Sequence, residues 1–540
     1  MADLIITNAR IWTGDPARPS AEAIAIQGAR VAALGTATEI DEHRTRATRV
    51  VDARGRRVVP GFIDAHLHVP WGALQLRSVD LKDARSASDF VERIAARVQA
   101  AAGEWVQGGG WDEQAWTPPT LPTRDLIDPI SPTTPVFVKR YDVHAALANT
   151  VALRLAGVTD DTPDPPGGTI VRDERGRPTG VLKDAATQFV QRVIPAPSPL
   201  QRRRDLLNAL AEMRRAGITS AHDMNPSADD LRAYVELANR GELTTRLYAV
   251  PLETEWIAAR RAGGMVDALD SLSPSAESYL RSRAVKGFSD GSLGSGTAYF
   301  FEPYCDDPGN FGLLSEELRP MEDFRARLVE ADAAGRQLCM HAIGDRAVAI
   351  MLDLFADVRR QNGARDRRLR IEHAQHLVPG DFARFKALDV MASVQPYHLI
   401  DDGRWAERRI GPHRLDRAFA FRTFLEHGVR LAFGTDWPVA PLNPMLTLHA
   451  AVTRATLDGR NPDGWVPAQK LSVAEALEAY TLGAAFAEGA EAEKGSLAAG
   501  KWADLVVLSD DILAIDPARI PDVRVEMTLA GGRIVHGEDE

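Results

Sequence analysis

The sequence predicts an α/β protein, a (β/α)₈ barrel of the TIM type accompanied by a small β domain. Strand and helix patterns alternate through the second half of the chain, and the two chain ends carry similar β-hairpin patterns. The length of 540 residues is enough for a barrel with a long insertion. Repeated βα units require a parallel sheet with right-handed crossovers. A doubly wound sheet is the alternative, but the number of units and the length favour the barrel.

Composition and charge narrow the class of protein. Hydrophobic residues make up 45% of the chain and charged residues 26%, as in ordinary globular proteins, which excludes a fibrous, collagenous or disordered chain. The 64 basic and 75 acidic side chains give a formal net charge of −11. This charge does not favour binding to nucleic acids or to anionic membranes, so we expect neither as a partner.

No hydrophobic segment predicts a membrane span or a secretion signal. The first fifteen residues hold only a four-residue apolar run beside an acidic residue, and no other stretch approaches about eighteen apolar residues. The two cysteines, Cys305 and Cys339, are too few for a disulfide framework and are expected to be buried thiols of a reducing compartment. We therefore expect a soluble, cytoplasmic protein.

Both chain ends are rich in short strand patterns. Residues 3–14 and 525–537 each contain a β-rich run, a turn of small residues and a second β-rich run, which is typical of a hairpin. Further short strands are expected at 23–26, 30–34, 48–52 and 504–508. We predict that residues 1–59 and 490–540 form one composite β domain, into which residues 60–489 are inserted as the barrel.

The middle of the chain supplies the βα units. Four strands are expected from the apolar patterns at 336–341, 369–373, 390–395 and 429–436. The first three are followed by the helical patterns 347–355, 381–388 and 419–427, and a capping box at 472–475 opens a further helix. Residues 80–215 are less regular and rich in Gly and Pro. We interpret them as a long insertion between the first and third strands that contributes to the mouth of the barrel.

The strongest chemical signal is the motif GFIDAHLH at residues 61–68. Successive side chains of a strand point in opposite directions, so His66 and His68 face the same side at the point where the strand ends. Two imidazoles so placed are suited to share a cation. A single His-x-His pair is more often structural, however, so the motif does not predict a metal site by itself.

Three later residues occupy equivalent positions. His341, His373 and Asp436 each end an apolar strand, with spacings of 32 and 63 residues that fit one and two βα units. In a barrel these strand ends meet at one mouth. Each residue alone has a structural explanation, as a core histidine, a loop contact or a helix cap. Five such residues at corresponding strand ends, counting His66 and His68, are better explained as ligands of zinc or a related divalent ion.

Several phrases of the sequence resemble a known family. They are VKGFSDGSLGSGTA at 285–298, HAIGDRAV at 341–348, IEHAQ at 371–375, FGTDWP at 433–438 and GSLAAGKWADLVVL at 495–508. Together with the histidine and aspartate positions they resemble the amidohydrolase superfamily, and within it the long-chain amidohydrolase family 3 branch typified by N-substituted formamide deformylase. The resemblance covers almost the whole chain. It implies a metal-dependent hydrolase on a barrel, flanked by a small β-sandwich domain built from both chain termini.

The resemblance also implies a ligand set. It assigns His66, His68 and Asp436 to a first metal and His341 and His373 to a second. Lys286 would lie between the two metals, since in many members the corresponding lysine is carboxylated by CO₂ and bridges them. Zinc is the family's usual metal, but the same ligands accept Mn, Fe or Co. The sequence leaves open whether one or two metals bind and whether Lys286 is carboxylated.

The implied reaction is hydrolysis of a carbon–nitrogen bond in a small, fairly apolar amide or formamide. A bound metal lowers the pKa of water from near 15.7 to about 7. Asp436 would take the proton from the attacking water and deliver it to the leaving amine. No Gly-x-Ser-x-Gly motif or Cys–His arrangement competes as a nucleophile.

Three other functions are alternatives to the amide hydrolase, and the sequence favours them to different degrees. An esterase or lactonase would use the same activated water, and the sequence does not separate it from an amidase. A heterocycle deaminase is disfavoured, because such relatives usually place a Glu three residues after the histidine equivalent to His341, where this chain has Gly344 followed by Asp345. A non-catalytic binding protein is disfavoured because all expected ligand positions hold competent residues.

Further side chains are expected near the mouth as substrate contacts, and they are His144, His222, Asp290, Trp111 and Trp437. His376 and His398 are interpreted as histidines behind the ligands or in loops. A small molecule is the expected partner, and an edge of the terminal β domain offers a surface for a homodimer. The sequence determines neither the exact substrate nor the oligomeric state, because specificity depends on the insertion and on loops that vary within one fold.

Overall fold

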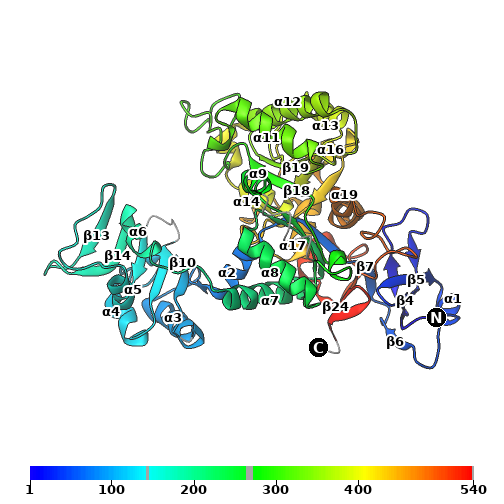
Figure 1. Ribbon diagram of the computed structural model, residues 1–540, viewed down its shortest axis with the longest axis horizontal. Helices are drawn as coiled ribbons and strands as arrows, with labels where there is room; N and C mark the ends of the chain where they lie inside the picture. The colour runs from blue at the N-terminus through cyan, green and yellow to red at the C-terminus, as the bar shows by residue number, and fades with distance from the viewer. Residues whose placement is uncertain (102, 141–144, 263–271, 538–540) are drawn as a thin grey trace. The chain divides into compact units, whose positions relative to one another are not determined.

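The computed structural model describes residues 1–101, 103–140, 145–262 and 272–537 (Figure 1). The chain forms two compact units. The first contains residues 1–70 and 209–540, and the second contains residues 71–208. The candidate ligands all lie in the first unit, which therefore positions the site.

The first unit is built around two parallel sheets. One has the order β17-β16-β15-β8, with β17 (Leu280–Arg281), β16 (Arg246–Val250), β15 (Ile218–Met224) and β8 (Phe62–Leu67). The other has the order β18-β19-β20-β21-β22, with β18 (Ala284–Phe288), β19 (Gln337–Ala342), β20 (Arg370–His373), β21 (Met391–Val394) and β22 (Leu431–Phe433). The α/β class expected from the sequence is thereby confirmed.

Backbone hydrogen bonds link the two sheets at two places. The amide of Lys286 in β18 donates to the carbonyl oxygen of Pro251, just after β16, at 2.8 Å. The amide of Asp436 donates to the carbonyl oxygen of His66 at 2.7 Å, which links the chain after β22 to β8.

Helices follow most of the strands. They are α8 (Ala228–Asn239), α9 (Glu253–Arg261), α11 (Met321–Ala333), α12 (Asp345–Asn362), α13 (Asp381–Leu388), α16 (Phe421–Glu426) and α17 (Pro444–Thr453). Figure 1 shows α11, α12 and α13 on the outer side of β18 and β19. The capping box expected at 472–475 is present, because Ser472 and Glu475 exchange hydrogen bonds with each other's backbone at the start of α18 (Val473–Glu478).

One strand bound differs from the sequence expectation. The strand expected over 429–436 ends at Phe433, and Asp436 lies beyond it with a positive φ of 62°. Strand β15 continues to Met224, so His222 lies inside it. In addition, Cys305 is exposed and not buried as expected, whereas Cys339 is buried.

The two chain ends contribute strands to one sheet. It has the order β25-β24-β23-β7-β2-β3, with β25 (Arg533–His536), β24 (Val525–Ala530), β23 (Leu505–Leu508), β7 (Arg57–Pro60), β2 (Arg10–Trp12) and β3 (Ser20–Ala21). A second sheet, β5-β4-β1-β6, contains β5 (Arg30–Gly35), β4 (Ala23–Gln27), β1 (Leu4–Thr7) and β6 (Arg49–Asp52). Apolar side chains from both sheets share one core cluster that includes Ile6, Ile24, Val58 and Leu505.

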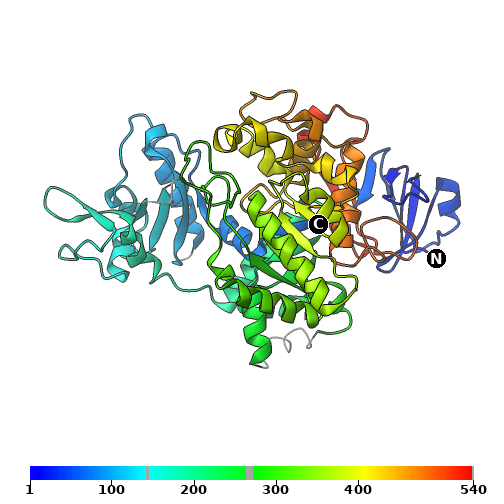
Figure 2. The same ribbon diagram turned by 90° about the horizontal axis from the view of Figure 1, so that it is seen from above.

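The second unit is a six-stranded mixed sheet with helices (Figure 2). Its strand order is β13-β14-β12-β11-β10-β9, with β13 (Gly168–Arg172), β14 (Pro178–Asp184), β12 (Ala145–Ala148), β11 (Val136–Arg140), β10 (Val106–Trp111) and β9 (Val79–Asp80). It falls in the chain between β8 and β15, which pair directly with each other, and not between a first and a third strand as expected.

No helix in the described ranges combines the length and the apolar character needed to cross a bilayer.

One carboxyl of the first unit gives a pH-dependent test of the fold. Helix α14 (Pro396–Asp402) ends at Asp402, and burial raises the pKa of this carboxyl to about 7 from the usual 3.8. Between about pH 4 and pH 7 the folded protein therefore holds a proton that the unfolded chain has lost. The free energy of unfolding must fall as the pH rises through this window.

We predict that Asp402→Asn, which mimics the protonated carboxyl, stabilises the protein increasingly from pH 4 to pH 7. The gain should reach about 1–2 kcal/mol at pH 8. Urea denaturation across this pH range measures it. Asp401→Asn is the control, because that carboxylate is 45% exposed and faces Arg404. A variant difference that does not depend on pH would contradict the prediction.

Candidate metal centre

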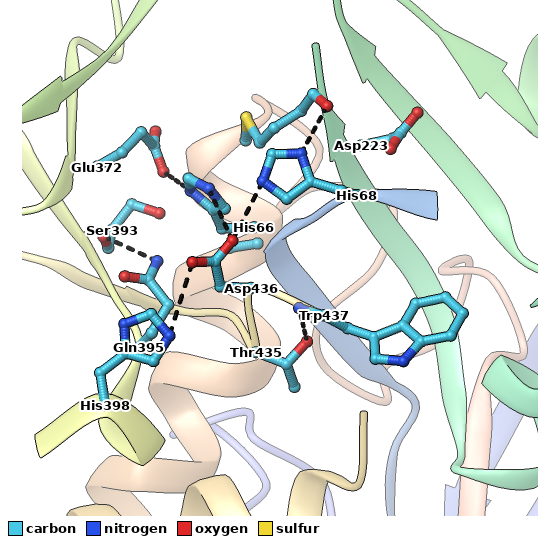
Figure 3. Close-up of polar contacts among 12 residues, drawn as sticks. His66, His68, Asp223, Glu372, Ser393, Gln395, His398, Thr435, Asp436 and Trp437 are labelled. Atoms are coloured by element: carbon cyan, nitrogen blue, oxygen red, sulfur yellow. Dashed lines mark hydrogen bonds and ion pairs between the residues drawn. The ribbon is translucent and has the colours of Figure 1, made fainter. Parts of the chain in front are cut away.

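The structure brings five sequence-predicted residues together in the first unit. They are His66, His68, His341, His373 and Asp436. Figure 3 shows His66 and His68 beside Asp436. One ligand atom each of His66, His373 and Asp436 lie within 4.8 Å of one another. The Nε2 atom of His68 is 3.1 Å from Oδ1 of Asp436, and the rings of His341 and His373 are 4.5 Å apart.

Strand geometry accounts for this convergence. Two residues of the set lie inside the parallel strands, and the others lie at or just after strand ends. His66 is in β8 and His341 in β19, while His373 ends β20 with a φ of 74°. Because β19 and β20 are parallel neighbours, their carboxyl ends lie at one edge of their sheet. The hydrogen bond from the amide of Asp436 to the carbonyl oxygen of His66 brings β8 to the chain that follows β22 in the same sheet.

Hydrogen bonds orient three of the imidazoles. The Nδ1 atom of His66 lies 2.7 Å from Oε2 of Glu372, and Nδ1 of His68 lies 3.0 Å from the carbonyl oxygen of Met224. His341 instead uses Nε2, which is 3.2 Å from the carbonyl oxygen of Gly291. In each ring one nitrogen donates to an oxygen, so the other nitrogen carries the lone pair that a metal requires.

The site favours neutral histidines. Burial, and then the charge of Lys286, lowers the pKa of His66 well below its ordinary value. Burial also lowers the pKa of His373 strongly, and the neighbouring His341 adds to this effect. The Nδ1 atom of His373 is buried and has no hydrogen-bond partner within the described part of the chain. These features fit a metal ion, which binds the neutral form of imidazole.

Asp436 is ionised in this environment. Burial alone would raise the pKa of its carboxyl, but the adjacent imidazoles of His68, His66 and His398 hold the pKa below the ordinary value. Its Oδ1 faces His66 at 3.6 Å and His68 at 3.1 Å. Its Oδ2 faces Nε2 of His398 at 3.6 Å. The two oxygens therefore serve different neighbours.

Lys286 lies on β18 and is fully buried. Burial lowers the pKa of its ammonium group, which favours the neutral amine. Its Nζ has no hydrogen-bond partner among the described residues and lies 4.9 Å from the centre of the Phe288 ring. A buried amine without a partner is costly, so this position also fits a group that the protein takes up from solution.

A buried aspartate of the same motif holds Asp436 in place. Asp64 accepts hydrogen bonds from the amide of Thr435 at 3.0 Å, from its hydroxyl at 2.7 Å and from the hydroxyl of Tyr480 at 3.1 Å. Burial raises the pKa of Asp64 to about 7. Sequence reasoning missed this residue, although a carboxylate inside an apolar strand next to His66 was a signal that a partner exists.

Two further neighbours were not assigned from the sequence. Glu372 stands inside the quoted motif IEHAQ, and its contact with His66 could not be read from residues 306 positions apart. His398 was interpreted as a histidine behind the ligands or in a loop. The ring of His398 stacks on the ring of His373, with ring centres 6.2 Å apart. Its Nδ1 lies 3.4 Å from the side-chain nitrogen Nε2 of Gln375.

Two of the expected substrate contacts, His222 and Asp290, have hydrogen-bond partners within the protein. His222 is fully buried inside β15, where Arg370 donates to its Nδ1 at 2.9 Å. Asp290 is likewise engaged, because its carboxylate accepts from the amides of Ile343 at 3.0 Å and Gly344 at 2.8 Å. It fixes a loop beside His341 and does not present a free carboxylate to a ligand.

The tryptophans also serve packing. Trp111 is fully buried in the second unit, where it packs on Phe90 and donates to the carbonyl oxygen of Val138 at 3.2 Å. Trp437 follows Asp436 directly but is only 4% exposed, and Figure 3 shows its ring turned away from that carboxylate. His144 lies outside the described residues.

Comparisons with known proteins agree with the geometry. The model of the amidohydrolase family matches residues 49–536. The chain is 37% identical over 523 residues to protein LONG AFTER FAR-RED 3 of Arabidopsis thaliana, covering 94% of this chain and 87% of that protein. It is 30% identical over 544 residues to N-substituted formamide deformylase of Arthrobacter pascens, covering 98% of each. Among solved structures, an uncharacterized metal-dependent hydrolase from Pyrococcus horikoshii shares 28% identity with a TM-score of 0.77, covering 95% of this chain and 99% of that one.

We predict that Gly434→Ala disrupts the site. A Cβ at this position would lie 2.5 Å from the backbone nitrogen of His66 and 2.8 Å from its carbonyl oxygen, which are atoms that cannot move aside cheaply. The free energy of unfolding should fall by about 1–3 kcal/mol, and zinc bound per chain after reconstitution should decrease. Gly309→Ala is the matched control, because its Cβ would meet nothing within 4 Å. Unchanged zinc content in Gly434→Ala would count against the close approach at this site.

Proposed function

The chain belongs to the amidohydrolase family, and we propose that it is a metal-dependent hydrolase that cleaves a carbon–nitrogen bond in a small, fairly apolar amide or formamide. The observation that carries this proposal is the convergence of His66, His373 and Asp436 within 4.8 Å in a buried cluster. The full-length similarity to a formamide deformylase supports the choice of substrate class.

The donor set suits one or two divalent ions, with zinc as the first choice. His66, His68 and Asp436 would hold one ion, and His341 and His373 a second. The unpaired, buried amine of Lys286 supports carboxylation, because a carbamate would supply two oxygens to the adjacent cations. When bound, the metal lowers the pKa of a water molecule toward neutrality and polarises the substrate carbonyl.

Asp436 would transfer the proton from the attacking water to the leaving nitrogen. Asp436 is ionised and lies at the centre of the cluster, so its carboxylate is ready to accept the proton that the attacking water releases. The same carboxylate returns the proton to the leaving nitrogen. His398 faces Oδ2 of Asp436 and is held on its other side by Gln375, so it orients the oxygen that does not face His68.

The structure bears on the two alternative reactions. In the related deaminases, a carboxyl group that follows the histidine equivalent to His341 protonates the heterocyclic ring of the substrate. Here Asp345 is only 3% exposed, and its carboxylate accepts a hydrogen bond from the amide of Phe301 at 3.0 Å. This engagement argues against ring protonation by Asp345. Ester or lactone hydrolysis uses the same water and the same aspartate, so it stays the main alternative.

We also propose that the two parallel sheets form the halves of a closed (β/α)₈ barrel and that the terminal sheets form a β-sandwich. The hydrogen bonds from Lys286 to Pro251 and from Asp436 to His66 support the first proposal. The core cluster shared by strands of both chain ends supports the second.

A substrate screen tests the proposed function. Zinc-reconstituted protein is incubated with a panel of N-formyl and N-acyl amines, and released amine is measured, while aryl esters and lactones are tested in parallel. We expect amine release that is lost after chelation and restored by zinc. Turnover of esters or lactones alone would replace the amidase with the alternative, and metal-independent turnover would remove the proposed mechanism.

We predict that Asp436→Asn lowers kcat by about 10²–10⁴-fold, because the amide oxygen cannot carry the proton between water and leaving group. Thermal unfolding should show that the variant remains folded. Near-normal turnover would remove Asp436 from the mechanism. Asp345→Asn is the control, because that carboxylate caps a loop amide and is expected to leave kcat within a few-fold of the parent value.

We further predict that Lys286→Ala loses most of its activity and that added bicarbonate or a short carboxylate restores part of it, because a free anion can replace the carbamate. Measuring kcat and bound metal with and without the additive checks this. Two metals retained per chain in Lys286→Ala without any added anion would contradict the bridging role.

A further inference from the structure

A continuous series of buried polar side chains lies behind the candidate metal centre. It begins at the ligand His66 and passes through Glu372, Arg370 and His222 to Glu488. Each contact is between side chains that are almost inaccessible to solvent, since the exposed fractions are 1% for His66 and 0% for Glu372, Arg370 and His222. Buried charges are retained in a core only where they are paired, so the series needs an explanation.

Arg370 is the hub of this series. Its Nε is 2.8 Å from Oε1 of Glu372 and its Nη2 is 3.1 Å from Oε2, so the guanidinium engages both carboxylate oxygens. Nη2 also donates to the carbonyl oxygen of Ala65 at 2.7 Å and to the hydroxyl of Ser393 at 3.0 Å. These partners stand on β8, β20 and β21. Arg370 therefore fixes the carboxylate of Glu372 relative to the strand that carries His66.

Glu372 in turn fixes the orientation of the His66 ring. Its Oε2 accepts from Nδ1 of His66 at 2.7 Å, as Figure 3 shows. That bond places the ring proton on Nδ1 and turns Nε2 toward Asp436, 3.6 Å away. A carboxylate behind a ligating histidine fixes both the tautomer and the ring orientation.

The far side of Arg370 is also anchored. Nη1 donates to Nδ1 of His222 at 2.9 Å, so this ring accepts on Nδ1 and carries its proton on Nε2, which lies 3.6 Å from Oε1 of Glu488. Glu488 is paired with Lys494, and both are buried. Two compensated ion pairs, Arg370–Glu372 and Lys494–Glu488, thus stand on either side of the neutral His222.

We infer that Arg370 is a positioning residue for the metal ligand His66, acting through Glu372, and that it raises the affinity of the site for a divalent metal ion. This inference rests on the proposed function, because it assigns His66 to the metal. Lysine cannot replace Arg370, since a single ammonium cannot engage both oxygens of Glu372 and also reach Ala65, Ser393 and His222.

The test measures metal affinity and not activity alone. Purified apo-protein of the parent, Arg370→Met, Arg370→Lys, Glu372→Gln and the double variant Arg370→Met/Glu372→Gln is titrated with zinc against a chelating indicator. Cobalt-loaded samples are compared by their visible spectra, which report ligand geometry. Arg246→Met is the matched control, because Arg246 forms a buried ion pair with Asp504 at 2.8 Å in the same unit but has no contact with a candidate ligand within the described residues.

We expect both Arg370 variants to bind zinc about 10–100-fold more weakly than the parent and to show an altered cobalt spectrum. Saturating zinc should restore much of kcat with little change in KM. Arg246→Met should lose stability while keeping parental zinc affinity and an unchanged spectrum. The double variant should bind zinc no more weakly than Glu372→Gln alone, because Arg370 acts through that carboxylate.

Parental zinc affinity and an unchanged cobalt spectrum in a folded Arg370 variant would overturn the inference. So would fully additive losses in the double variant. If Arg370→Met does not fold, Arg370→Lys, which keeps the positive charge, carries the same comparison. A parent protein that binds no divalent ion would instead refute the proposed function. If the parent binds zinc but has no amidase activity, the zinc affinities of the variants still decide the role of Arg370.

Discussion

The site depends on one backbone junction, where the chain after β22 meets β8. The amide of Asp436 donates to the carbonyl oxygen of His66, and Gly434 lets the two backbones approach within a distance that no side chain would permit. Asp64 secures the same junction through Thr435. Because of it, a histidine from the first parallel strand and an aspartate from beyond the last one stand beside each other although 370 positions separate them.

A second constraint is electrostatic. The unit buries ionisable groups in its interior, and each must be matched locally because the desolvation of a single charge costs several kcal/mol. The protein meets this requirement with pairs. Arg370 matches Glu372, Lys494 matches Glu488, and the carboxylate of Asp436 stands among imidazoles. Lys286 differs from these pairs, since its amine has no hydrogen-bond partner in the described ranges, and this is the observation that supports the proposed carboxylation.

The sequence predicted most of the strands and the five candidate ligands that the structure brings together, because both leave local signals. His66 and His68 follow from alternation along a strand, and His341, His373 and Asp436 from equivalent positions in successive units. The roles of Glu372 and Asp64 were not predictable, because their partners His66 and Thr435 come from elsewhere in the chain. His222, Asp290 and Trp111 were expected near a substrate, and the structure gives each of them a partner within the protein. A polar or aromatic residue near a strand end has the same sequence signature whether it faces a ligand or a buried partner, and only packing separates the two.

The two carboxylate oxygens of Asp436 face different neighbours, and this difference bears on the proposed proton transfer. Oδ1 lies toward His66 and His68, on the side where a metal would be held, while Oδ2 lies toward His398. A proton taken up on Oδ2 therefore leaves the contacts of Oδ1 in place. His398 stacks on His373, its Nδ1 lies 3.4 Å from the side-chain nitrogen of Gln375, and its Nε2 faces Oδ2 of Asp436 at 3.6 Å. In the proposed mechanism, one oxygen of Asp436 would bind the metal while the other carries the proton, so neither role displaces the other.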